Sequence, residues 1–438
     1  MNKKAALHNL GCKVNAYEME AMRQLLVEAG YEIVPFVPGA DVYVINTCTV
    51  TNIADRKSRQ MLHKAKKMNP QAVVVAAGCY SQTSREAVEA DPCVDIVLGN
   101  NRKGELVEAL ELYQAAGNPQ GVYSRITEIG KEKDCEDLHV EETSEHTRAS
   151  LKVQDGCNQF CSYCIIPYAR GRIRSRVPED VCREVKTLTE NGCREIVLTG
   201  IHLSSYGKDH GSSLQELILR VHEIEGVKRI RLGSLEPGII TEEFAKTIGG
   251  LEKLCPHFHL SLQSGCDATL RRMNRRYTTE EYREKCHLLR ETFDEPALTT
   301  DVIVGFPGET QEEFDQTAAF LEEIALYETH IFKYSRRKGT KAASMPNQVA
   351  ESVKNERSAY LIELGEKNRR RFEEKHLGRE AEVLFEEKIS LQGKEYYTGY
   401  TKEYIKGALP ADRDYTNQCR RGRLGEKIGD HLYLLENH

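Results

Sequence analysis

The sequence predicts an α/β protein of three domains, in which a parallel sheet comes first, a partial α/β barrel follows and a small β-barrel ends the chain. Strand-like and helix-like runs alternate over most of the chain, a pattern typical of parallel sheets. The final stretch instead contains short strand patterns with no helix between them. Its 438 residues exceed what one ordinary core accommodates, so two or three domains are expected.

The predicted first domain, residues 1–130, contains three apolar runs that each end in a cysteine: KKAALHNLGC, DVYVINTC and AVVVAAGC. The helical pattern NAYEMEAMRQLLVEAG follows the first run and ends on glycine, as helices often do. The carboxyl ends of strands share one edge of a doubly wound parallel sheet, so Cys12, Cys48 and Cys79 are expected to converge. Cysteine also ends strands for packing alone, but three equivalent positions favour a shared site.

The boundaries of the other two domains follow from composition. Residues 131–148 form the predicted exposed linker, because seven acidic and three basic side chains occur there without periodicity. The middle domain, residues 149–376, ends in a helical run near 350–376, and residues 377–438 form the small barrel. The barrel's charge is balanced, ten basic against eleven acidic residues. Its candidate base-stacking groups, for which core roles stay equally open, are Tyr396, Tyr397, Tyr400 and Tyr404.

The middle domain has six predicted strands: ASLKVQDG, EIVLTG (195–200), RIRLGS (229–234), HFHLSLQ (257–263), LTTDVIVGF (298–306) and THIFKYS (329–335). Helical runs such as SLQELILRVHEIEG and TEEYREKCHLLRETF lie between them, which indicates a partial (β/α)6 barrel. Chemistry in such barrels collects where strands end. The site candidates on this ground are Thr199, Gly200, Ser234, Glu236, Gln263 and Gly305. Each one singly is equally well a turn residue or a helix cap.

The stretch QDGCNQFCSYC places Cys157, Cys161 and Cys164 within eight residues. The chain shows no apolar run long enough for a signal peptide or a membrane span, so we expect a cytoplasmic protein without membrane contact. In a reducing compartment, clustered cysteines indicate metal ligands rather than disulfides. A structural zinc site with a fourth ligand from elsewhere is one reading. The other is a [4Fe-4S] cluster that three thiolates hold, which leaves one iron open to a substrate or cofactor.

The cysteine spacing, with aromatic Tyr163 just before the third cysteine, resembles the radical S-adenosylmethionine (SAM) superfamily. The resemblance implies that Cys157, Cys161 and Cys164 hold a [4Fe-4S] cluster whose open iron SAM chelates, with Tyr163 near the SAM adenine. The segment DVIVGFPGET resembles the superfamily's fifth-strand segment beside that adenine. In that superfamily an electron from the cluster breaks SAM into methionine and a 5′-deoxyadenosyl radical, which removes hydrogen from an unactivated C–H bond.

The segments LGCKVN, NTCTV, AAGC and CSYCIIPYARG together resemble the methylthiotransferase branch of that superfamily, over essentially the whole chain. The resemblance implies a flavodoxin-like first domain with an auxiliary [4Fe-4S] cluster on Cys12, Cys48 and Cys79, and a final domain of the TRAM type. It implies that one SAM methylates sulfur attached to the auxiliary cluster while another supplies the radical. The implied partners are a tRNA anticodon stem-loop, an electron donor such as flavodoxin or ferredoxin, and a sulfur source.

Three substrate branches are known in that family: two act on hypermodified adenosines beside the tRNA anticodon, and one acts on an aspartate of ribosomal protein S12. The segments GCKVN, YCIIPYARGRIRSR and TGIHLSSYG look most like the branch that methylthiolates C2 of N6-threonylcarbamoyladenosine at position 37. Isopentenyladenosine and the S12 aspartate are the alternative substrates. A zinc-stapled RNA-binding protein without catalysis is the alternative of a different class.

Four arginines follow the cysteine loop at every second position: Arg170, Arg172, Arg174 and Arg176. In an extended segment, a period of two places all four guanidinium groups on one face. The threonylcarbamoyl group carries a carboxylate that an isopentenyl group lacks, and arginine binds carboxylates through two parallel hydrogen bonds. We therefore expect at least one of the four to contact that carboxylate. A solvated basic edge or general phosphate contacts are the plainer interpretation for any one of them.

Overall fold

The computed structural model describes residues 3–117, 121–143 and 147–436. The first domain is built on a sheet of six parallel strands in the order β2-β1-β3-β4-β5-β6. The strands are β1 (Lys4–Asn9), β2 (Glu32–Ile33), β3 (Val42–Thr47), β4 (Val73–Gly78), β5 (Ile96–Leu98) and β6 (Tyr123–Arg125). Strands β3 and β4 are buried along their whole length, as their continuous apolar sequence requires. The first five strands follow the 2-1-3-4-5 order of flavodoxin-like sheets, which confirms the predicted fold.

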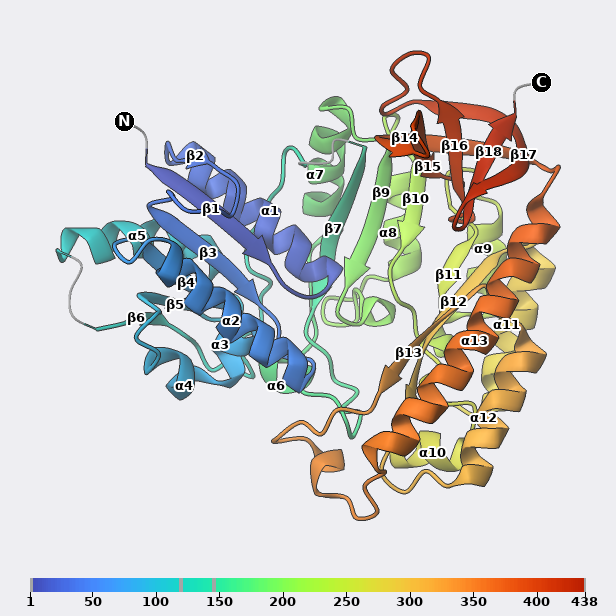
Figure 1. The fold of residues 1–438 in the computed structure, drawn as a ribbon, viewed down its shortest axis with the longest axis horizontal. Helices are drawn as coiled ribbons and strands as arrows, with labels where there is room; N and C mark the ends of the chain where they lie inside the picture. Colours follow the sequence, from blue (N-terminus) through green and yellow to red (C-terminus); the bar gives the residue numbers. More distant parts are fainter. Residues whose placement is uncertain (1–2, 118–120, 144–146, 437–438) are drawn as a thin grey trace.

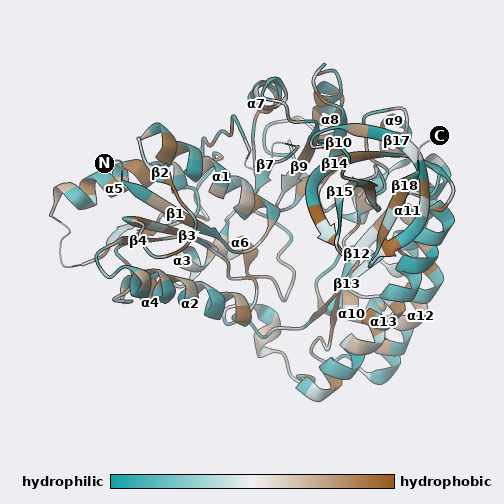
Figure 2. Cartoon of the chain, turned by 45° about the horizontal axis from the view of Figure 1, so that its top comes forward, coloured by the Kyte–Doolittle hydropathy of each residue, from teal (hydrophilic) through white to brown (hydrophobic). Residues whose placement is uncertain are grey.

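Helices cover both faces of this sheet (Figure 1). They are α1 (Lys13–Glu28), α2 (Asn52–Met68), α3 (Cys79–Thr83), α4 (Arg85–Glu89) and α5 (Leu106–Ala115), with a short 3-10 turn η1 (Lys103–Glu105). Apolar residues of α1 and α5 pack on one face of the sheet, and those of α2, α3 and α4 pack on the other. Figure 2 shows hydrophobic residues concentrated along β3 and β4, between helices that carry hydrophilic residues outward. The two apolar faces hold the strand ends, and therefore the cysteines that follow them, in fixed positions.

The middle domain contains six parallel strands in chain order: β7 (Arg148–Asp155), β9 (Glu195–Gly200), β10 (Arg229–Leu232), β11 (His257–His259), β12 (Ala297–Val304) and β13 (Glu328–Lys333). Strands β7, β9 and β10 pair in one sheet and β11, β12 and β13 in another, and bridges such as Leu235 to Leu260 connect the two. A two-residue strand, β8 (Arg174–Ser175), runs antiparallel to β7. The predicted six-unit partial barrel is confirmed.

The helices of this domain lie outside the partial barrel, except that the first of them lies beside α3 of the first domain (Figure 1). They are α6 (Ile166–Ala169), α7 (Pro178–Glu190), α8 (Leu214–His222), α9 (Glu242–Gly249), α10 (Asp267–Arg272), α11 (Thr279–Thr292), α12 (Gln311–Ile324) and α13 (Glu351–His376), with 3-10 turns η2 (Leu203–Ser205), η3 (Pro237–Ile239) and η4 (Lys341–Ser344). Capping boxes start α11 and α12, where the sequence places threonine three residues before glutamate. Helix α13 matches the predicted helical run near 350–376.

The final domain is a closed five-stranded barrel in the order β14-β15-β16-β18-β17. Its strands are β14 (Glu380–Leu391), β15 (Lys394–Tyr400), β16 (Lys406–Pro410), β17 (Cys419–Gly429) and β18 (Leu432–Glu436). This barrel sits on the amino ends of the middle-domain strands (Figure 1). There Arg229 donates hydrogen bonds to the carbonyl oxygens of Tyr400 and Glu382, at 2.7 and 2.6 Å. The predicted small C-terminal β-barrel is confirmed.

Two of the four candidate base-stacking tyrosines are used in this domain contact. Tyr400 and Tyr404 stack on each other with ring centroids 4.5 Å apart. The guanidinium group of Arg148 lies 5.3 Å from each ring, and that of Arg231 lies 4.7 Å from Tyr404. The two rings therefore pack against side chains of the protein itself, and these contacts explain their positions without a stacked RNA base.

The linker expected over residues 131–148 is not exposed throughout. Leu138 and Val140 are buried in the core of the middle domain. The carbonyl oxygen of Leu138 accepts a hydrogen bond from Tyr17 of α1 at 2.6 Å, and the amide of Val140 donates to Glu184 of α7 at 2.9 Å. The segment therefore connects the first domain to the second through these contacts. Its residues 144–146 lie outside the described part of the chain.

Within that described part, none of the helices combines the length and the apolar character needed to cross a membrane.

Candidate active site between the first two domains

The first set of thiols lies at the carboxyl ends of three neighbouring strands. Cys12 precedes α1, Cys48 directly follows β3, and Cys79 begins α3 after β4. Gly11 has a φ of +113°, and a β-carbon there would lie 3.2 Å from the sulfur of Cys48. Only glycine accepts that conformation without strain, so it lets the loops after β1 and β3 approach closely. The structure thus brings together the three cysteines that the strand pattern placed at one edge.

The second set occupies the loop after β7. Gly156 has a φ of +70°, and a β-carbon there would lie only 1.8 Å from the carbonyl oxygen of Arg172. Phe160 also has a positive φ, of 51°, which is uncommon for a bulky residue. The side chain of Asn274 donates to the carbonyl oxygen of Phe160 at 3.0 Å and holds this turn. These contacts fix the loop that carries Cys157, Cys161 and Cys164.

In neither thiol set do all three sulfur atoms lie within 4.8 Å of one another. In the described part of the chain, three or more candidate ligand atoms lie within 4.8 Å of one another in two groups: His63, Asp91 and Cys93, and His259, Asp301 and His330. Neither thiol set is among these groups. Thiolates that bind the corners of a cluster stand farther apart than those around one ion, so the spacing fits a [4Fe-4S] group better than zinc.

Burial favours the protonated form of Cys48, Cys157 and Cys164. Desolvation raises the pKa of Cys48 and of Cys157 to about 11, and that of Cys164 to about 12. Nearby thiols add to these shifts, since Cys79 and Cys12 raise the pKa of Cys48 and Cys161 raises that of Cys164. Several neighbouring buried thiols would lose their protons only if a cation stabilised the thiolates, and the iron of a bound cluster would do so.

A polar side chain donates a hydrogen bond to one sulfur of each set. Arg275 donates from Nη1 to Cys161 Sγ at 3.4 Å, and Asn100 donates from Nδ2 to Cys79 Sγ at 3.5 Å. The same Asn100 amide donates to the carbonyl oxygen of Ala169 in α6, at 2.7 Å. Asn100 thus links the first thiol set to the helix that follows the second. Neither Arg275 nor Asn100 belongs to a recognisable sequence pattern, so sequence reasoning missed both.

The other site candidates also lie at the carboxyl ends of the barrel strands. Glu236 Oε2 is 2.8 Å from His202 Nε2 and accepts from Gln159 Nε2 at 2.7 Å. Tyr163 packs edge-on against Phe306, with centroids 6.4 Å apart. This contact places the aromatic residue of the cysteine loop beside the GFPGET segment. His202 was not predicted, although it lies in the quoted segment TGIHLSSYG.

The remaining candidates show mixed environments. Thr199 and Gly200 end β9, and exposed Ser234 follows β10. Gln263 has a φ of +71°, and its backbone N–H donates to the carbonyl oxygen of Asp301 at 2.9 Å. Gly305 has a φ of +71°, and a β-carbon there would lie 2.3 Å from the side chain of Lys354. All of them lie at the same end of the barrel as the cysteine loop.

The four alternating arginines do not form a shared cationic face, so that expectation is wrong. Arg170 and Arg174 have no exposed surface and Arg176 is 8% exposed, whereas Arg172 is exposed. The segment is extended only over β8, because α6 ends at Ala169 and Gly171 has a φ of +73°. The period of two therefore does not apply across it.

The buried arginines pair with carboxylates instead. Arg170 binds Glu18 and Asp155, Arg174 lies 3.7 Å from Asp155, and Arg176 lies 2.6 Å from Glu184. Only Arg172 stays accessible, with its guanidinium group 4.5 Å from the ring centroid of Phe160.

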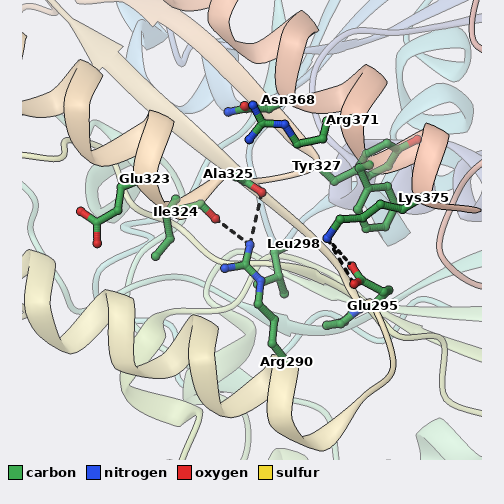
Figure 3. Close-up of a pocket in the computed structure, with 12 residues that line it drawn as sticks. Arg290, Glu295, Leu298, Glu323, Ile324, Ala325, Tyr327, Asn368, Arg371 and Lys375 are labelled. Carbon is green, nitrogen blue, oxygen red and sulfur yellow. Dashed lines mark hydrogen bonds and ion pairs between the residues drawn. The ribbon is translucent and has the colours of Figure 1, made fainter.

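A separate pocket between α11, α12 and α13 holds none of the candidates (Figure 3). Arg290 there donates to the carbonyl oxygen of Ile324 at 2.6 Å, where α12 ends. Lys375 pairs with Glu295 at 3.0 Å. Both contacts join neighbouring elements, so Arg290, Lys375 and Glu295 have structural partners.

Comparison with known proteins identifies the family to which this chain belongs. The Radical SAM superfamily model matches residues 151–321, and the model described as Uncharacterized protein family UPF0004 matches residues 4–99. The chain is 44% identical to Threonylcarbamoyladenosine tRNA methylthiotransferase MtaB of Bacillus subtilis (strain 168), over 93% of this chain and 91% of the relative. It is 43% identical to the protein of the same name from Aquifex aeolicus (strain VF5), over 90% and 95%.

A relative with another substrate in its name is also similar. The chain is 36% identical to tRNA-2-methylthio-N(6)-dimethylallyladenosine synthase of Moorella thermoacetica, over 94% of each chain. Among solved structures, the radical S-adenosylmethionine methyltransferase TsrM of Kitasatospora setae matches with a TM-score of 0.55 and 16% identity, over 76% of this chain and 75% of that one. At 16% identity, this structural match supports the similarity of fold alone.

Proposed function

Since the chain belongs to the radical SAM tRNA methylthiotransferases, we propose that it adds a methylthio group to C2 of N6-threonylcarbamoyladenosine at position 37 of tRNA. The single observation that carries the proposal is the position of two three-thiol sets on either side of one domain boundary, which Asn100 bridges. A substrate held between them would meet a radical source and a sulfur source together. The choice of substrate is supported by the identity of 44% and 43% to the Bacillus subtilis and Aquifex aeolicus threonylcarbamoyladenosine enzymes, against 36% to the Moorella thermoacetica dimethylallyladenosine enzyme.

Each domain would hold one of the two cofactor clusters. Cys12, Cys48 and Cys79 would bind the auxiliary [4Fe-4S] cluster, and the loop cysteines 157, 161 and 164 would bind the cluster that SAM chelates. When bound, these groups supply the electron for SAM cleavage and the sulfur to be transferred. The absence of a compact single-ion geometry in either thiol set of the described chain, and the hydrogen bonds from Asn100 and Arg275 to sulfur, fit this assignment.

The chain's own side chains would position the cosubstrate rather than act as nucleophiles. Tyr163, seated on Phe306, would pack beside the SAM adenine. Glu236 is held by His202 and Gln159 and contributes to the electrostatic field at Cys157, so it would orient polar groups of SAM next to the open iron. The other proposed SAM contacts are Thr199, Gly200, Ser234, Gln263 and Gly305. We further propose a flavodoxin or ferredoxin as electron donor, a separate sulfur source and a cytoplasmic setting.

The test of this function is a comparison of two substrates. Anaerobically purified, cluster-loaded enzyme is given tRNA that carries threonylcarbamoyladenosine or isopentenyladenosine, and the nucleosides are analysed by mass spectrometry. We expect a mass gain of one methylthio group on the threonylcarbamoyl substrate only. Modification of the isopentenyl substrate alone would select the dimethylallyladenosine activity named for the Moorella thermoacetica relative. A colourless protein that contains zinc and has no activity would exclude both.

Arg275 should set the reduction potential of the cluster that Cys161 holds. Hydrogen bonds and positive charge at cluster sulfurs make the cluster easier to reduce. We expect Arg275→Met to make the midpoint potential more negative in a titration followed by electron paramagnetic resonance, with Arg275→Lys in between. The control is Arg276→Met, which removes an exposed arginine of the same segment. Equal potentials in Arg275→Met and wild-type enzyme would contradict this role.

A further inference from the structure

The interior of the partial barrel is polar, although barrels of this kind usually fill their interior with branched apolar side chains. On β12, Leu298, Val302 and Val304 pack outward in the core shared with the helices, so Thr299 and Asp301 face inward. The same alternation turns His257 and His259 of β11 inward, because Phe258 lies in that core. An interior built this way is suited to a polar group of a ligand.

The final domain closes one end of this interior. Tyr404 stacks on His257 with centroids 5.0 Å apart and an interplanar angle of 28°. Arg231 donates to the carbonyl oxygen of Lys402 at 3.0 Å and pairs with Glu195 at 2.8 Å. Access for a ligand is therefore left at the opposite end, where the cysteine loop lies.

Lys13 brings an unpaired charge to this interior. It follows Cys12 directly, on helix α1, which packs against β7 and β9. The residue keeps solvent-accessible surface, yet partial burial, followed by the positive charges of Arg231 and Arg148, lowers the pKa of its ammonium group, and Glu195 raises that pKa. In the described part of the chain no carboxylate lies within 4 Å of its ammonium group, whereas Glu195 is already paired with arginine. Lys13 therefore has its charge free for an anionic ligand.

A second observation points to a ligand in the same place. His257 is only 8% exposed, yet its Nδ1 has no hydrogen-bond partner among the described residues. Buried polar atoms in native proteins nearly always have a partner, so one that lacks it marks a position for water or a ligand group. Burial, followed by the positive charges of Arg231 and Lys13, holds the pKa of His257 well below its usual range.

We propose that the inward-facing surface of the barrel, with Lys13 as counter-charge and His257 as a hydrogen-bonding partner, binds the carboxylate-bearing N6 substituent of the adenosine. The proposal rests on the proposed function and names the residues that select its substrate. C2 and the N6-bearing carbon belong to the same ring of the base. Sulfur transfer at C2 beside Cys12 therefore brings the substituent within reach of the next residue in the chain. An isopentenyl group would leave the ammonium of Lys13 unpaired.

The test measures RNA binding apart from catalysis. Cluster-loaded wild-type and Lys13→Met proteins are titrated, at one salt concentration, with anticodon stem-loops that carry threonylcarbamoyladenosine or unmodified adenosine at position 37. Wild-type protein should prefer the modified RNA. Loss of a charge-assisted contact should reduce that preference about thirtyfold in Lys13→Met and leave binding of the unmodified RNA unchanged. Lys13→Arg should keep the preference, and Lys64→Met, an exposed lysine of α2, should behave like wild type.

The outcomes separate this proposal from the proposed function. Equal weakening of both RNAs in Lys13→Met would identify a phosphate contact and overturn the carboxylate site. If Lys13→Met kept the wild-type preference for the modified RNA, the carboxylate site would be overturned as well. The proposed function would still hold in either case, provided that the wild-type enzyme methylthiolates threonylcarbamoyladenosine. If wild-type enzyme modifies only isopentenyl tRNA, the function itself fails. Should Lys13→Met not load its clusters, His257→Phe replaces it in the same binding comparison, and an unchanged preference there would overturn the site.

Discussion

Replacing Cys157 by serine should abolish the reductive cleavage of SAM, whereas replacing Cys48 should leave cleavage measurable while methylthiolation is lost. Cys157 belongs to the loop after β7, and its cluster would be the sole path for an electron to SAM. Cys48 follows β3 of the other domain and would hold the sulfur-donating cluster. The measurements are 5′-deoxyadenosine formation and mass spectrometry of tRNA nucleosides, both under anaerobic conditions. This is the largest effect we expect, because each variant removes a cofactor.

Iron content and a matched cysteine provide the controls. Each variant should lose about half of the bound iron, since one of two four-iron clusters is affected. Cys182→Ser alters a partly exposed cysteine of α7 outside both sets and should keep full iron and activity. If folded Cys157 and Cys48 variants behaved alike in the 5′-deoxyadenosine assay, the separate roles of the two sets would be wrong.

Much of the fold could be predicted because it depends on local patterns. Continuous apolar runs fixed β3 and β4, and the predicted barrel strands begin within one residue of the observed ones, as at Glu195 and Arg229. The convergence of Cys12, Cys48 and Cys79 also followed, since carboxyl ends of neighbouring parallel strands share an edge. These inferences needed the type and order of the elements but no knowledge of which surfaces meet.

The arrangement of polar side chains could not be predicted in the same way. The arginine pattern indicated one exposed face, but the backbone turns at Gly171, and the first domain covers Arg170. Arg275 and Asn100 reach the thiols from segments distant in sequence, and no periodicity marks such residues. Tyr404 likewise serves a domain contact that composition does not reveal. Burial between domains is a tertiary property, so single-sequence patterns miss it.

Arg170 belongs to a buried ionic group that joins the first two domains. Glu18 of α1 contacts Arg170 at 2.8 Å, Lys152 of β7 at 2.8 Å and Lys103 at 3.0 Å, and all four side chains are at most 4% exposed. Lys152 also lies 2.7 Å from Asp155. Burial alone would raise the pKa of Glu18, but Arg170, Lys103 and Lys152 hold that pKa well below its usual range. The carboxylate is therefore charged at neutral pH, and it neutralises cations from both domains.

Glu18→Gln should therefore destabilise the protein strongly. The amide keeps the shape of the side chain but leaves three buried cations short of one carboxylate, which typically costs about 3–5 kcal/mol. Thermal unfolding should shift downward, and limited proteolysis should cut more readily between the first two domains. Glu20→Gln on the same helix removes a partly exposed pair with Arg23 and should cost at most about 1 kcal/mol. Arg170→Met should resemble Glu18→Gln in both assays. An Arg170→Met variant with unchanged stability but altered preference between the two tRNA substrates would contradict the structural role and restore the substrate contact that the sequence suggested.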